Sequence, residues 1–302
     1  MNLLRDKSAG AGPEASGGER FFWLDRLRHH CASRECPERG RVWPRWRTGS
    51  EEIAFAGQRY CGPSCAEAAF AQEIEGHLLR ARQEEARPHR VPLGLLLVSR
   101  GLISSAQLQE ALRRQRERPG ARLGSVLLET RALDETSLTA ALGLQWGCPV
   151  FPLENSRAYR ECAGLVPLAL LQSRGILPAH HSPATRVLHL AFTRRIDHTL
   201  LYAIEQMCGV RAVPCVAPDR LVAEALQRLQ IPPAEESVFD SVRGPHDMAH
   251  LAAGYAGKLG AARVQIAGAA DHVWLRFENA RGSHHLLFHS PTPKPPAAAL
   301  AR

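Results

Sequence analysis

The feature that most restricts the fold of this chain is an internal repeat with a period of 30 residues. When residues 92–115 are aligned with residues 122–145, 7 of 24 positions carry the same amino acid, including an opening Leu-Gly pair and a closing Gln. Several other positions are apolar in both copies, such as Leu96 with Val126 and Ile103 with Leu133. The apolar spacing within each copy predicts two short helices. Because one helix pair cannot bury its own apolar face, the two copies must close on each other or on a neighbouring segment.

Glycine and capping residues mark the expected ends of these helices. In the first copy Gly101 suits the left-handed position that follows a helix. Ser104 and Gln107 then have the spacing of a capping box for the second helix. In the second copy Asp134 takes the capping role, but Arg131 stands where the glycine is expected and fits a left-handed conformation poorly.

The tandem pattern R-L-G-x-x-L-[VLI]-x-x-G-[LVI]-[LVI]-x4-L-x3-L-x2-Q resembles the N-terminal domain of type II secretion and type IV pilus assembly ATPases. The segment that follows, residues 163–230, is similar to the second half of that domain, with apolar strands expected at 187–192 and 210–216. The resemblance covers residues 92–230. It implies a helical tandem-repeat subdomain, residues 92–146, packed with a small α/β subdomain. Residues 246–289 are more weakly similar to the small α/β domain that precedes the motor in those ATPases.

In many members of this family the tandem repeat binds cyclic di-GMP, so the resemblance implies a nucleotide site. Arginine offers a planar fork for guanine edges and phosphates, and leucines can enclose the bases. Pro92, Arg131 and Arg194 depart from the family pattern, so a degenerate repeat kept for protein contacts remains the alternative. Carried over position by position, the nucleotide-binding candidates are Leu93, Gly94, Leu97, Leu112, Gln115, Arg122, Leu123, Gly124, Leu127, Leu142 and Gln145.

Four of the eight cysteines form two close pairs, Cys31 with Cys36 and Cys61 with Cys65. Two short pairs from separate turns supply the four sulfur ligands of a tetrahedral zinc ion. The second pair leads directly into an apolar-periodic helix over residues 66–79, which is typical of a treble-clef-type module. Cysteines that cluster without a metal are the alternative interpretation.

The remaining cysteines have no such pairing, and we expect small buried apolar residues there. A histidine next to the first pair could also replace one cysteine as a ligand. The unpaired cysteines are Cys148, Cys162, Cys208 and Cys215, and the neighbouring histidines are His29 and His30.

Composition excludes several classes of protein. None of the three lysines, Lys7, Lys258 and Lys294, lies in a G-x-x-x-x-G-K-[ST] motif, so the sequence contains no P-loop. We expect no catalysis. The absence of a secretory signal and of a long apolar stretch predicts a cytoplasmic protein without membrane insertion. The net charge is +8, but the arginine run at 113–118 alternates with acids, which favours a solvated face over nucleic-acid binding.

These patterns predict an α+β multi-domain protein with a small four-cysteine zinc module, the two subdomains described above and a C-terminal small α/β module. We expect a non-catalytic regulatory or adaptor protein that binds cyclic di-GMP and contacts secretion or pilus machinery proteins. A nucleotide-independent interaction scaffold with a structural zinc finger and a zinc-dependent nucleic-acid-binding regulator are the alternatives. The expected boundaries are a disordered leader (1–19), the zinc module (20–82), the family-like domain (92–230, divided at 92–146 and 163–230), a linker (231–237), the C-terminal module (246–289) and a disordered tail (290–302).

Overall fold

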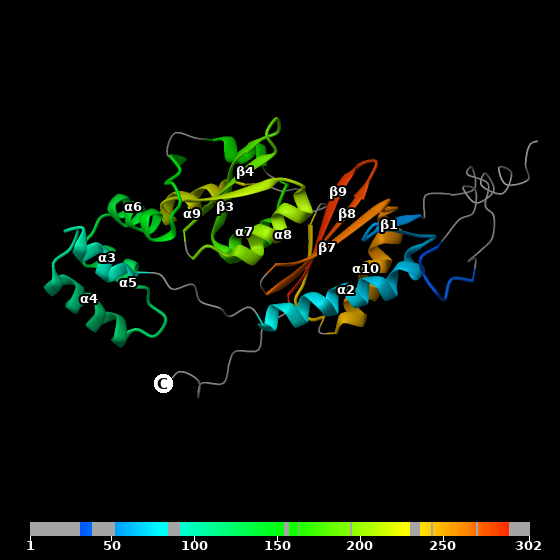
Figure 1. Cartoon of the computed structure of the whole chain (residues 1–302), viewed down its shortest axis with the longest axis horizontal. Coiled ribbons are helices and arrows are strands. Elements are labelled where there is room, and N and C mark those ends of the chain that lie inside the picture. Colours follow the sequence, from blue (N-terminus) through cyan, green and yellow to red (C-terminus); the bar gives the residue numbers. More distant parts are fainter. Residues whose placement is uncertain are drawn as a thin grey trace, which may run out of the picture.

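The computed structural model describes residues 31–37, 52–83, 91–153, 157–162, 164–193, 195–229, 236–242, 244–269 and 271–289. The expected leader, the expected tail and Arg194 lie outside these ranges. The parts form a row along the long axis of the molecule (Figure 1). The helices of residues 93–146 lie at one end, a small sheet lies in the middle, and a larger sheet lies at the other end. The mixed α and β architecture agrees with the predicted fold class.

The tandem repeat folds as two helix pairs with a core of their own. The capping box at Ser104 and Gln107 is present in both directions, and Gly101 has a φ of 68°. Arg131 takes the equivalent left-handed conformation with a φ of 54°, although a side chain is strained there. The helices are α3 (Leu93–Ser99), α4 (Ser105–Glu117), α5 (Leu123–Glu129) and α6 (Glu135–Trp146).

A three-stranded sheet with the order β3-β4-β5 follows the repeat. Strands β3 and β4 are antiparallel, and α8 connects β4 to the parallel strand β5. The sequence pattern did not predict β3, because its first four residues are all buried and give no alternation. The elements are η3 (Ala158–Cys162), α7 (Leu168–Arg174), β3 (Ile176–Ser182), β4 (Val187–Phe192), α8 (His198–Cys208), β5 (Arg211–Val216) and α9 (Asp219–Arg228).

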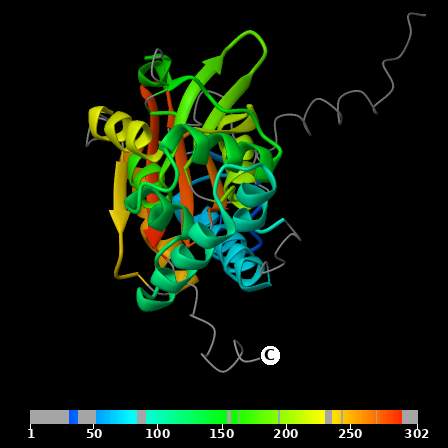
Figure 2. The ribbon, with the colours of Figure 1, turned by 90° about the vertical axis from the view of Figure 1, so that its left-hand side faces the viewer.

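The larger sheet has six strands in the order β2-β1-β7-β8-β9-β6. Helices α2 and α10 pack against each other and share one hydrophobic core with this sheet. Viewed along the long axis, the repeat helices lie in front of the strands of this sheet (Figure 2). The elements are β1 (Ile53–Phe55), β2 (Gln58–Tyr60), α2 (Pro63–Gln83), β6 (Glu236–Phe239), α10 (Pro245–Leu259), β7 (Arg263–Ala269), β8 (His272–Asn279) and β9 (Gly282–His289).

This sheet contains strands from two segments that were predicted to be separate modules. The hairpin β1–β2 comes from the expected zinc module, and β1 pairs in parallel with β7 of the C-terminal module. Strand β6 begins at Glu236, inside the expected linker 231–237, and pairs in parallel with β9. The physical reason is that the meander β7-β8-β9 has two open edges, which are paired or covered in folded proteins. Pairing over such sequence distances leaves no local signal.

The small α/β subdomain packs on the larger sheet, and the two share a second core that includes Trp274 and Leu287. The buried His285 links them, because its Nδ1 accepts from Trp274 Nε1 at 3.1 Å and its Nε2 lies 3.1 Å from the carbonyl oxygen of Gly164. The carboxylate of Glu236 accepts from the first two backbone amides of α7, at 2.7 and 2.9 Å. Within the described part of the chain, no helix combines the length and the apolar character needed to cross a membrane.

Candidate nucleotide site and candidate metal centre

The two copies of the repeat are closed on each other by their final glutamines. Gln115 Nε2 donates to the carbonyl oxygen of Ala121 at 2.9 Å, and Gln145 Nε2 donates to that of Val91 at 2.7 Å. Each acceptor lies two residues before the Leu-Gly pair of the other copy. Helix α4 packs on α5 as α6 packs on α3. Exchanging the two copies therefore reproduces the same contacts, which is the signature of an approximate two-fold arrangement.

The glycines of the two Leu-Gly pairs allow the helices to approach closely. A Cβ on Gly94 would lie 2.6 Å from Leu108 Cδ1 and 3.3 Å from Leu123 Cδ2. A Cβ on Gly124 would lie 3.1 Å from Leu138. The contact between Gly94 and Leu123 also brings the starts of α3 and α5 together. Packing thus explains why both copies carry glycine at this position.

The candidate leucines fall into two groups. Leu97 and Leu127 are completely buried in the core of the repeat, so they have no surface for a ligand in this conformation. The other four remain partly exposed, which leaves apolar surface for a base, and three of them, Leu93, Leu123 and Leu142, pack against that core. The four are Leu93, Leu112, Leu123 and Leu142.

The two halves of the arrangement differ in charge where the family pattern places an arginine. Arg122 is the N-cap residue of α5 and is exposed, and within the described residues its guanidinium has no ion-pair partner. Pro92 occupies the equivalent N-cap position of α3. One half therefore presents a cation and the other an uncharged ring.

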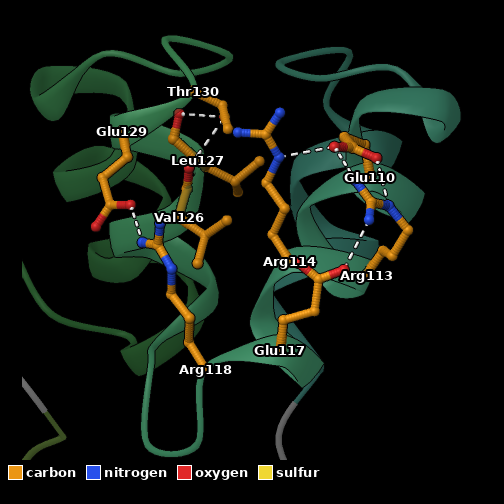
Figure 3. Close-up of polar contacts among 9 residues, drawn as sticks. All are labelled: Glu110, Arg113, Arg114, Glu117, Arg118, Val126, Leu127, Glu129 and Thr130. Atoms are coloured by element: carbon orange, nitrogen blue, oxygen red, sulfur yellow. Dashed lines mark hydrogen bonds and ion pairs between the residues drawn. The ribbon is translucent and has the colours of Figure 1, made fainter.

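The arginine-rich run on α4 is largely neutralised by acids (Figure 3). Arg113 and Arg114 bond to the same Glu110 carboxylate at 2.8 and 2.7 Å, and Arg118 bonds to Glu129 at 2.6 Å. Hydrogen bonds from Arg113 and Arg114 lower the pKa of Glu110 to about 2. This surface is a solvated helix face, as its alternation of charges predicted.

The four paired cysteines come together in space. Their Sγ atoms all lie within 4.8 Å of one another, and both the Cys36–Cys61 and Cys61–Cys65 sulfur pairs are 3.4 Å apart. All are free thiols. A tetrahedron with Zn–S distances of about 2.3 Å has sulfur–sulfur edges of about 3.8 Å, so the observed spacing fits a zinc ion. Cys65 lies in the first turn of α2.

The four thiols affect one another's protonation. Burial raises the pKa of Cys65 to about 11, and burial together with hydrogen bonds to neighbouring thiols raises that of Cys61 as well. Burial opposes ionisation of Cys31, but hydrogen bonds from the backbone of Cys61 and Ser33 outweigh it and lower its pKa. A metal ion bound between these sulfur atoms would therefore have to displace their protons.

Three of the other four cysteines have raised pKa values. Burial raises the pKa of Cys162 and Cys208 to about 11 and that of Cys215 to about 12, so these thiols stay protonated near neutral pH. Cys162 and Cys215 are buried, as predicted, whereas Cys148 and Cys208 are only half-buried.

Sequence reasoning missed a groove of about 870 Å³ that lies between α8 of the small α/β subdomain and the part of the molecule that contains α2 and β7. One wall is formed by α2 and the β1–β2 turn, the other by α8, and β7 contributes as well. Tyr202, with 63% of its surface exposed, and Arg80 lie among its lining residues. The lining comes from segments far apart in the chain, so no local motif could reveal it.

Comparison with known proteins places a family match on the α/β subdomain that follows the repeat. Residues 146–236 match the MshEN domain, which is less than half of the chain. The type IV pilus assembly ATPase PilB of Myxococcus xanthus is 27% identical over 139 residues, covering 45% of this chain and 24% of that protein. PilB of Thermus thermophilus is 28% identical over 122 residues, covering 40% of this chain and 14% of that protein. The chain thus spans a quarter or less of the length of these relatives.

Two solved structures are also similar. A structure of MshE with cdg is 27% identical, with a TM-score of 0.41, and covers 47% of this chain and all of that one. The N-terminal domain of XpsE is 14% identical, with a TM-score of 0.35, and covers 52% of this chain and 96% of that one. The family match and the two relatives confirm the predicted resemblance: over less than half of its length, this chain is similar to the N-terminal domain of pilus and secretion ATPases.

Proposed function

We propose that this protein is a non-catalytic regulatory component of a type IV pilus or type II secretion system that responds to cyclic di-GMP. The observation that carries the proposal is the closed, approximately two-fold arrangement of the two motif copies, with the starts of α3 and α5 in contact. Cyclic di-GMP consists of two identical halves, and a two-fold arrangement offers each half an equivalent surface. The similarity to PilB supports the pathway.

Different residues of the repeat would make different contacts with the nucleotide. The exposed guanidinium of Arg122 would pair with a guanine edge or a phosphate, because it is planar and always charged. The partly exposed leucines would pack against the bases. Gln115 and Gln145 would act by holding the two motif starts in place, since their amide N–H groups already bond to backbone carbonyls.

Isothermal titration calorimetry of the purified chain with cyclic di-GMP tests the proposal. We expect binding that Arg122→Ala weakens by about 10- to 100-fold, because a hydrogen-bonded charged contact contributes about 1.5–3 kcal/mol. Arg116→Ala is the matched control, since it removes the same charge from the exposed surface of α4. An absence of binding, or equal effects of the two substitutions, would refute the nucleotide site.

We also propose that Cys31, Cys36, Cys61 and Cys65 hold a structural zinc ion. The spacing of the four sulfur atoms supports it. Metal analysis of the purified chain should find about one zinc per chain. The Cys61→Ser, Cys65→Ser double variant should lose it, and a chain that purifies with its fold intact and free of metal would contradict the site.

A nucleotide-independent interaction scaffold is the second candidate, and two exposed leucines, one on α3 and one on α6, favour it. Leu95 and Leu144 are 60% and 56% exposed, whereas the equivalent positions of the other copy hold Ser125 and Arg114. The fold therefore does not require leucine at these positions. Capture of a pilus assembly ATPase that is unaffected by cyclic di-GMP but lost in the Leu95→Ser, Leu144→Arg variant would support this alternative.

A further inference from the structure

The N-terminal hairpin is attached to the C-terminal sheet by very little backbone pairing. Strands β1 and β2 have three residues each, and an isolated pair of such strands is at most marginally stable. The parallel register between β1 and β7 consists of Ala54 opposite Arg263, with a hydrogen bond from Ala54 N to the carbonyl oxygen of Ala262 at 2.9 Å. Hydrogen bonding between strands alone therefore does not account for a stable junction.

The four cysteines lie at this junction. Cys61 directly follows β2, and the backbone N–H of Ala32 donates to the carbonyl oxygen of Arg59 in β2 at 2.9 Å. Cys31 and Cys36 are buried, and they belong to the same core as Phe55. That core also contains side chains of β7, β8, β9 and α10. The cluster is thus embedded in the contact between the first and last parts of the chain.

The segment that carries Cys31 and Cys36 has no helix or strand of its own. Residues 31–37 consist of turns and irregular backbone, so their burial in the core needs another source of order. A tetrahedral metal bound by two cysteines of this segment and two at the hairpin and α2 would supply it, because in small domains binding of a structural metal provides folding free energy.

We propose that metal binding at the four cysteines closes the six-stranded sheet: α2 already packs on α10, and the ion holds residues 31–37 and the β1–β2 hairpin against β7. This inference rests on the proposed zinc site and adds a consequence that the site alone does not require. The helical repeat has a separate core, and therefore its folding is independent of the metal. The part of the 870 Å³ groove wall that the β1–β2 turn forms depends on the metal as well.

Hydrogen exchange of the full chain, followed by mass spectrometry before and after zinc removal with a chelator, tests this proposal. We expect amides of 53–60 and 263–269 to lose protection by roughly 100-fold, whereas amides of 93–146 keep theirs, because each cooperative unit opens separately. Adding zinc back should restore protection in both segments. Unchanged protection at 263–269 after measured zinc loss would overturn the proposal that the metal closes the sheet. The proposal of a zinc site would not be affected.

Two controls keep the test decisive if the metal-free chain unfolds. Cys208→Ser removes a half-buried thiol outside the cluster, and it should leave both zinc content and protection of 53–60 unchanged. Cyclic di-GMP titration of the chelated chain reports on the repeat alone. Retained binding supports independent folding, whereas simultaneous loss of protection at 93–146 and at 263–269 would overturn the proposed division. A chain that binds no zinc at all would overturn both the proposed zinc site and the proposal that the metal closes the sheet.

Discussion

Acidification should weaken the fold through one buried histidine between pH 6.5 and 4. Burial lowers the pKa of His285 from an ordinary value of 6.5 to about 4, and the Arg276 and His284 charges nearby act in the same direction. The ring is only 2% exposed, accepts a hydrogen bond from Trp274 and bonds to the carbonyl oxygen of Gly164. A proton on Nδ1 would remove the acceptor that Trp274 needs. The folded state therefore keeps this ring neutral.

The size of the effect follows from the two pKa values. The unfolded chain takes up a proton near pH 6.5, whereas the folded chain does so only near pH 4. Between these values the unfolded state binds more protons, so the free energy of unfolding falls as the pH falls. Linkage gives a loss of about 1.4 kcal/mol at pH 5.5 and about 2.5 kcal/mol at pH 4.5, relative to pH 7.5.

Urea unfolding at pH 7.5, 6.5, 5.5 and 4.5, monitored by tryptophan fluorescence because Trp274 contacts the ring, measures this loss. His285→Gln should be less stable at pH 7.5, since it loses part of a buried hydrogen-bond network, but its stability should change much less with pH. His77→Gln is the control, because burial also lowers the pKa of His77, and the His77 ring packs elsewhere, against Gly268. If the His285 variant keeps the full pH dependence, the reasoning is refuted.

Four further substitutions test how the parts are held together. Glu236→Ala should lower the free energy of unfolding by about 2 kcal/mol in urea titrations, because two backbone amides lose a charged acceptor, while Glu129→Ala on the surface should have a smaller effect. Arg131→Gly should raise stability by about 0.5 kcal/mol, the relief of a left-handed side chain less the entropy of glycine, and a loss of stability would contradict the strain. Gln115→Leu and Gln145→Leu should each weaken amide protection in 93–146, corresponding to about 1 kcal/mol. An effect on nucleotide affinity alone would instead indicate direct contact with the ligand.

The helices were predictable because their signals are local. The cap residues Ser104 and Asp134 and the left-handed Gly101 act over a few residues and lie where expected. The joining of the hairpin to the C-terminal strands was not predictable, because Ala54 and Arg263 are paired across most of the chain. Strand β3 was missed for a different reason: its first four residues are all buried, so they show no alternation that would distinguish a strand from a loop or helix segment.

The candidate nucleotide site shows what agreement between two copies of a motif can establish. Gly94 and Gly124 are needed for helix packing, Leu97 and Leu127 fill the core, and the final glutamines close the ring of four helices. All of these residues would recur in both copies even if no ligand were ever bound. Their recurrence is therefore evidence for the closed fold, whereas evidence for a ligand must come from positions that folding does not constrain. Arg122 and its counterpart Pro92 are such positions, since both are exposed at equivalent caps, and the ligand question reduces to what that one guanidinium contacts.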